Sequence, residues 1–221
     1  MNYLSHYYFD KDDDRPHYIL GLILPDLVRT FNRERLQPQI IETHWDVPIR
    51  NLQEGVNKHH HIDKLFHSSN FFRTYNKKTF KQLQQIELEG ITKYRHFISH
   101  VLIEMLLDRL LLKEDLNTAF TFYYKLNATD KLIFMNYFNH IPAVEGDLEN
   151  LWLFFQRFCS SEFLYDYQNN EGLILRLGGV MQRITKQSFT ATDKVKLSLF
   201  IDGLEGELKG VYKGIFEELN F

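Results

Sequence analysis

The chain has 221 residues, enough for one large domain or two small ones with a substantial buried core. Hydrophobic residues make up 44% of it and charged residues 25%, which is ordinary for a soluble globular protein. The net charge of −3 gives no basic surface for nucleic acid or for an anionic membrane, so neither is expected as a partner. The lone cysteine, Cys159, excludes an internal disulfide framework and fits a reducing compartment. The N-terminus shows no secretory signal pattern and no apolar run is long enough for a bilayer, so a cytoplasmic protein is expected.

The N-terminal part of the chain contains one apolar run with an acid near its end. Residues 2–8 suit a short helix or a buried segment, and residues 18–28 are mostly apolar. Asp26 ends this run, where a carboxylate is costly to bury without a partner. It could cap a helix that starts at Pro25, or it could bind a metal ion, and this segment alone favours neither interpretation.

The periodicity of apolar residues predicts a series of helices joined by short loops. A helix is expected over residues 51–68, and a second from residue 70 ends before Gly90. Apolar residues cover almost the whole circumference of the helix expected over residues 91–113, so this helix should be central and buried. Further helices are expected at residues 116–126, 130–138, 148–158, 172–186 and from Thr190 or Thr192 to 219, with a turn at Pro142 and Gly146. No repeat or linker divides them, so the sequence predicts a single all-α domain, a helical bundle over residues 1–221.

Two adjacent glycines, Gly178 and Gly179, lie inside the helix expected over residues 172–186. Each glycine costs a helix roughly 1 kcal/mol relative to alanine. The pair therefore predicts that another helix approaches closely at this point.

Four of the ten histidines lie on the helix expected over residues 51–68. Because residues four apart share a helix face, His59, Asp63 and His67 should form one column, with His60 at its edge. Apolar residues on the same face indicate that this column points toward the core, whereas His61 should point to solvent. Imidazoles and a carboxylate in line on a core-facing stripe are typical of a metal site.

A second column of the same kind interrupts the apolar surface of the helix expected over residues 91–113. It consists of His96, His100 and Glu104, again four residues apart. An ionised glutamate inside a core costs several kcal/mol unless a cation or hydrogen bonds compensate it. If the two columns pack face to face, they offer several nitrogen and oxygen ligands and an open position for water or substrate. Asp26 and His6, polar groups beside apolar sequence, are further candidates; the alternative is a hydrogen-bonded network of core histidines.

Other kinds of site find less support in the sequence. The absence of cysteine ligands argues against a closed structural zinc site and for an open catalytic one. There is no glycine-rich phosphate loop and no Gly-x-Ser-x-Gly elbow. Cys159 lies in a helix rich in aromatic residues, where an inert buried thiol is expected.

Four segments of the chain occur in an order that is also found in one hydrolase family. They are Asn2-Tyr3-Leu4-Ser5-His6, Gly21-x-x-Leu24-x-Asp26, Gly55-Val56 through His59 to Ile62-Asp63, and Glu171-Gly172-Leu173 through Leu177, Gly179 and Arg183. Together they resemble the acyl carrier protein phosphodiesterases, which remove 4′-phosphopantetheine from holo acyl carrier protein. The resemblance implies an all-α, HD-domain-like phosphodiesterase of lipid metabolism, with manganese as the usual ion and acyl carrier protein as a possible partner.

The chain departs from this family mainly by carrying imidazoles. His60 stands where the family has arginine, and His67 where it has an acidic residue. In the central helix, His96-x-x-x-His100-Val101 replaces an Asp-x-x-x-Asp-His run. More imidazole ligands shift the metal preference toward zinc, iron or nickel.

The sequence thus predicts a divalent-metal-dependent phosphodiesterase. The expected metal ligands are His6, Asp26, His59, His60, Asp63, His67, His96, His100 and Glu104. Asp26, Asp63 and Glu104 are the expected catalytic carboxylates, and Asp26 would bind the ion or orient the attacking water. Two alternatives stay open: a zinc phospholipase C-like or nuclease-like hydrolase, and a catalytically silent binding protein on the same fold.

Overall fold

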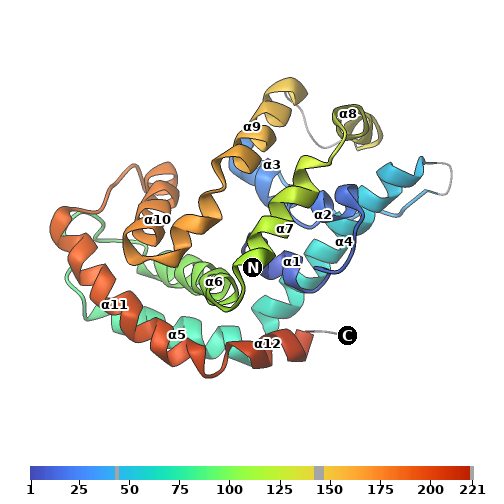
Figure 1. Cartoon of the computed structure of the whole chain (residues 1–221). Coiled ribbons are helices and arrows are strands. Elements are labelled where there is room, and N and C mark those ends of the chain that lie inside the picture. Colours follow the sequence, from blue (N-terminus) through green and yellow to red (C-terminus); the bar gives the residue numbers. More distant parts are fainter. Residues whose placement is uncertain (43–44, 142–146, 220–221) are drawn as a thin grey trace. The chain divides into compact units, whose positions relative to one another are not determined.

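The computed structural model describes residues 1–42, 45–141 and 147–219, so the turn expected at Pro142 and Gly146 lies outside the described residues. The described residues form twelve α-helices and one 3-10 helix and contain no strand, which confirms the all-α class (Figure 1). None of the helices in these ranges is long and apolar enough to cross a membrane.

The helices closely follow the expected elements. Their bounds are α1 (Tyr3–Tyr8), α2 (Pro16–Gly21), α3 (Leu24–Asn32), α4 (Val47–Ser68), α5 (Asn70–Gln84), α6 (Arg95–Glu114), α7 (Leu116–Asn127), α8 (Lys131–His140), α9 (Leu148–Ser161), the 3-10 helix η1 (Phe163–Gln168), α10 (Asn170–Thr185), α11 (Ala191–Lys209) and α12 (Tyr212–Leu219). The last expected helix is divided in two, because α11 ends at Lys209 and α12 begins at Tyr212.

Contacts within the chain define two compact units, each assembled from separate stretches of sequence. Unit 1 comprises Met1–Ser5, Leu65–Leu116 and Leu164–Phe221, and unit 2 comprises His6–Lys64 and Asn117–Phe163. Neither unit is therefore a continuous segment of the chain. The single domain expected over residues 1–221 and its HD-like arrangement stay predictions.

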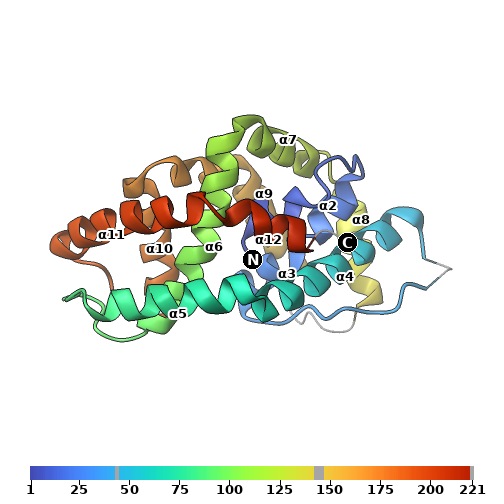
Figure 2. The ribbon, with the colours of Figure 1, turned by 90° about the horizontal axis from the view of Figure 1, so that it is seen from below.

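Helix α6 is the centre of unit 1, where it packs against α5, α10 and α11 (Figure 2). Its apolar residues are buried on most sides, which confirms the expectation of a central helix. Arg109 is buried among them, and its guanidinium donates to the Tyr167 carbonyl, to Asn170 Oδ1 at 2.7 Å and to Glu205 Oε2 at 2.9 Å. These acceptors compensate the cost of removing a charge from water.

Asp193 fastens the loop after α5 to the first turn of α11. Its carboxylate accepts hydrogen bonds from the backbone N–H groups of Glu89 at 2.7 Å, Gly90 at 2.8 Å and Thr190 at 3.1 Å. Thr190 in turn caps α11 by accepting a hydrogen bond from Asp193 N, which completes a capping box and confirms Thr190 as one of the two expected starts.

We expect Asp193→Ala to lower the free energy of unfolding by about 2–4 kcal/mol, because three backbone donors lose their acceptor. Urea unfolding measures the change, and Thr192→Ala, at an exposed position in the same turn, is the matched control. If Asp193→Ala lowered the free energy of unfolding by no more than the control does, these hydrogen bonds would not hold the loop.

Close contact between helices occurs at Gly21 and Gly55 of unit 2. A Cβ on Gly21 would lie 2.2 Å from the Leu52 carbonyl oxygen, and one on Gly55 would lie 2.2 Å from the Tyr18 carbonyl oxygen. Only glycine therefore lets the backbones of α2 and α4 touch here.

The expectation of a close helix approach at Gly178 and Gly179 is wrong. A Cβ on Gly179 would meet no atom within 4 Å in the described part of the chain, and one on Gly178 would make an ordinary 3.5 Å contact with Phe189. Glycine in a helix signals close packing only where a partner backbone faces it, and no such partner faces this pair among the described residues.

Candidate metal centre

Three of the expected ligands come together in unit 2. His6, Asp26 and His59 each offer one ligand atom, and these atoms lie within 4.8 Å of one another. The imidazole rings of His6 and His59 are stacked, with centroids 4.0 Å apart and planes inclined by 23°. Both histidines are buried, with 2% and 4% of their surface exposed. Two imidazoles and a carboxylate are a donor set that binds zinc, iron and related divalent ions.

The glycine contact between α2 and α4 positions one of these ligands. Leu22 follows Gly21 directly, and His59 lies one helical turn after Gly55. The two are hydrogen bonded, with 2.8 Å between His59 Nδ1 and the Leu22 carbonyl oxygen. Because Nδ1 must carry the proton of this bond, Nε2 of the neutral ring keeps its lone pair. His59 is thus held in the tautomer that a metal ligand needs.

Asp26 lies in the first turn of α3 and does not cap it. The N-cap residue is Ile23, which makes no side-chain capping bond, so the capping role considered for Asp26 is not observed. In the first turn, the partial positive charge of the helix N-terminus favours an ionised carboxylate. Asp26 is therefore suited to bind a cation.

His60 supports the same region without adding a ligand atom to the group. Its Nε2 donates to the Leu36 carbonyl at 2.7 Å, and its ring meets that of His59 at 83° with centroids 5.3 Å apart. Burial lowers the pKa of His60, although the Leu36 carbonyl opposes this effect. A neutral His60 therefore holds the loop that contains Leu36 against α4.

A second group of candidate ligands lies in unit 1. His67, His100 and Glu104 also offer ligand atoms within 4.8 Å of one another. Glu104 Oε1 is 3.1 Å from His100 Nε2, 3.6 Å from His67 Nε2 and 3.3 Å from the Met1 amine. Burial opposes ionisation of Glu104, but the charge of the amine and the imidazoles of His100 and His67 lower its pKa to about 2.

The remaining expected ligands lie outside both groups. Asp63 is half-buried on α4 and offers no ligand atom to either group. His96 is exposed, contrary to its expected place in the apolar surface of α6, while His61 is exposed as expected. His67, expected in one column with His59, is grouped with His100 and Glu104. The two groups belong to different units, and a single centre built from both columns stays a prediction.

Asp108 is a buried acid that the sequence did not single out. Its carboxylate accepts from Leu4 N at 3.0 Å, from Ser5 N at 2.8 Å and from Ser5 Oγ at 2.6 Å. Burial raises the pKa of Asp108 to about 7, although these hydrogen bonds favour the ionised form. The sequence did contain a signal for Asp108, because it is a charged residue within the apolar surface of the helix expected over residues 91–113.

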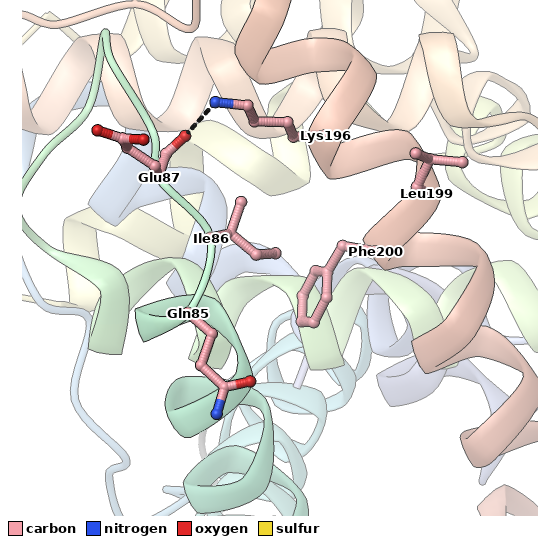
Figure 3. Close-up of a pocket in the computed structure, with 6 residues that line it drawn as sticks. All are labelled: Gln85, Ile86, Glu87, Lys196, Leu199 and Phe200. Carbon is pink, nitrogen blue, oxygen red and sulfur yellow. Dashed lines mark hydrogen bonds between the residues drawn. The ribbon is translucent and has the colours of Figure 1, made fainter.

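Neither the thiol of Cys159 in unit 2 nor a surface hollow in unit 1 offers a rival centre. Cys159 is buried as expected, and burial raises the pKa of its thiol to about 12, which disfavours the reactive thiolate. A surface hollow of unit 1 has Ile86 and Phe200 at its centre (Figure 3). Lys196 at its edge donates to the Glu87 carbonyl at 2.7 Å. The hollow is lined by Gln85, Ile86, Glu87, Lys196, Leu199 and Phe200, and no imidazole is among these described residues.

Comparison with known proteins identifies no family and no relative with which these candidate sites could be compared. No protein-family model, no curated protein and no solved structure matches the chain.

Proposed function

We propose that this protein is a divalent-metal-dependent phosphodiesterase whose metal centre consists of His6, Asp26 and His59. The observation that carries the proposal is the convergence of these three ligand atoms, together with the hydrogen bond that fixes the tautomer of His59. An ordinary core histidine needs no such arrangement of a second imidazole and a carboxylate around it.

The donor set suits hydrolysis because three protein ligands leave coordination positions open for water and substrate. When bound, the cation lowers the pKa of a bound water toward neutrality and polarises a phosphoryl oxygen. The protein contributes a buried setting that strengthens electrostatic interactions, and an aspartate at the start of α3. His60 holds the adjacent loop in place.

The resemblance to acyl carrier protein phosphodiesterases supports a phosphodiester as the substrate. The three ligands fall in three of the four resembling segments, one in each: His6 in the first, Asp26 in the second and His59 in the third. Segments far apart in the sequence thus contribute to one group of ligand atoms. On this basis, the substrate is the phosphodiester of holo acyl carrier protein or a related ester, and the cation is manganese, zinc, iron or nickel.

We expect His59→Ala to lose the bound cation and with it the hydrolysis of holo acyl carrier protein and of bis-p-nitrophenyl phosphate. Metal analysis after dialysis against manganese or zinc, followed by activity assays, measures both effects. His61→Ala is the matched control, because His61 lies on the same helix but is exposed. Unchanged metal content at this centre in His59→Ala would refute the proposed ligand set.

The same measurements separate the alternatives. Three bound zinc ions would favour a phospholipase C-like or nuclease-like hydrolase. The protein would instead be a silent binding protein if it hydrolysed neither ester with any of the four metals and if a chelator did not change its stability. Its histidines would then form a hydrogen-bonded network.

A further inference from the structure

We propose that His67, His100 and Glu104 of unit 1 form a second cation site, which shares no ligand with the centre of unit 2 and takes a first-row transition metal such as Zn²⁺, Co²⁺ or Ni²⁺. This site uses ligand atoms that the hydrolytic centre does not use, so it does not depend on the proposed phosphodiesterase activity.

The geometry around Glu104 brings two imidazoles to one carboxylate oxygen, beside the Met1 amine. Three nitrogen atoms lie between 3.1 and 3.6 Å from the same oxygen, Glu104 Oε1. His100 Nε2 at 3.1 Å and the Met1 amine at 3.3 Å lie within hydrogen-bond distance, and the two lone pairs of the oxygen can accept both. The 3.6 Å separation from His67 Nε2 is longer than a hydrogen bond, so hydrogen bonding to Glu104 Oε1 does not engage this third nitrogen. A cation between the two imidazoles and the carboxylate would use all three ligand atoms together.

An aromatic side chain holds the two imidazoles in place. The Phe72 ring meets the His67 ring and the His100 ring at 79° in each case, with centroid distances of 4.7 and 4.9 Å. The His67 and His100 rings themselves lie 4.8 Å apart, inclined by 31°. The ligands are therefore oriented before a cation binds, which lowers the entropic cost of binding.

The site is open to solvent, unlike the centre of unit 2. The side chains of His67, His100 and Glu104 are 30%, 36% and 14% exposed. A cation can therefore enter and leave without local unfolding. Chelator should remove the cation of this site faster than a cation bound by the buried His6 and His59.

A cation here would link two helices that are separated by α5 in the sequence. His67 lies in the last turn of α4, and His100 and Glu104 lie on α6. Because a cation that binds only the folded arrangement stabilises it, the melting temperature should rise with Zn²⁺ concentration.

The test is the number of Zn²⁺ ions bound by the whole chain, measured by isothermal titration and by metal analysis. We expect two equivalents for the wild type, one for His100→Ala, one for His59→Ala and none for the double variant. His96→Ala, one turn before His100 on α6 and exposed, should keep both. His67→Gln provides a second variant of the proposed site that keeps the size of the side chain.

The outcomes distinguish this site from the hydrolytic centre. If the wild type binds one ion that His59→Ala loses and His100→Ala keeps, the second site is refuted and the centre of unit 2 stands. If His59→Ala keeps every ion of the wild type and His100→Ala loses one, the second site stands and the centre of unit 2 fails. Circular dichroism of each variant verifies folding. The Zn²⁺-dependent rise in melting temperature should be smaller in His67→Gln and in His59→Ala than in the wild type, and absent when His59→Ala and His100→Ala are combined.

Discussion

Gly55→Ala should destabilise unit 2 by about 3 kcal/mol or more and should abolish the cation binding proposed for His59. The added Cβ would lie 2.2 Å from the Tyr18 carbonyl oxygen and 2.8 Å from the Gly21 Cα. Both are backbone atoms, which cannot turn aside as a flexible side chain could, so α2 and α4 must separate. Their separation would break the hydrogen bond from His59 Nδ1 to the Leu22 carbonyl. Gly21→Ala should act in the same way from the other helix.

The matched control is Gly203→Ala on α11. A Cβ there would meet no atom within 4 Å in the described part of the chain, and helix propensity alone predicts a gain of roughly 0.5–1 kcal/mol. Urea unfolding and metal analysis of the three variants separate a steric effect from a general effect of alanine. If Gly55→Ala were as stable as Gly203→Ala, the two helices would not be in the close contact described.

The positions of the longer helices could be predicted from sequence because apolar periodicity and capping residues are local signals, although the division of the last one into α11 and α12 was not predicted. Thr190, a possible start of the last long helix, is its N-cap, and Asp130 likewise caps α8. The packing of glycines could not be predicted in this way. Gly55 and Gly179 both lie inside helices, but only Gly55 faces a neighbouring backbone, and that depends on tertiary structure.

The candidate ligands could be recognised from residue type, but the way they group could not. A helix turns by about 100° per residue, so residues eight apart differ by about 80° in direction. A column such as His59, Asp63 and His67 therefore drifts around α4, and its two ends need not face the same neighbours. The structure groups His59 with Asp26 and groups His67 with Glu104. The same drift applies to His96 and Glu104 on α6, and His96 is exposed.

Asp108→Ala should lower the free energy of unfolding by about 3–5 kcal/mol, because it leaves two backbone N–H groups and one hydroxyl without their acceptor in the core. Asp108 is fully buried and accepts from Leu4 N, Ser5 N and Ser5 Oγ. Ser5→Ala is a graded control, since it removes only the hydroxyl donor and should cost about 1 kcal/mol. Equal losses in the two variants, measured by urea unfolding, would show that the backbone hydrogen bonds contribute little.

The titration of Asp108 should make the stability of the protein fall as the pH rises. Burial raises the pKa of Asp108 to about 7 in the folded protein, from 3.8, so between these values the folded state holds a proton that the unfolded state has lost. The contribution of this group to stability is therefore complete below pH 3.8 and is lost as the pH rises through about 7, at up to about 1.4 kcal/mol per pH unit. Asp108→Asn cannot titrate, so the stability of the wild type relative to this variant should fall across that interval and be level above it. If the difference in stability between the wild type and Asp108→Asn did not change between pH 4 and pH 7, the hydrogen bonds from Leu4 and Ser5 would outweigh burial and keep Asp108 ionised.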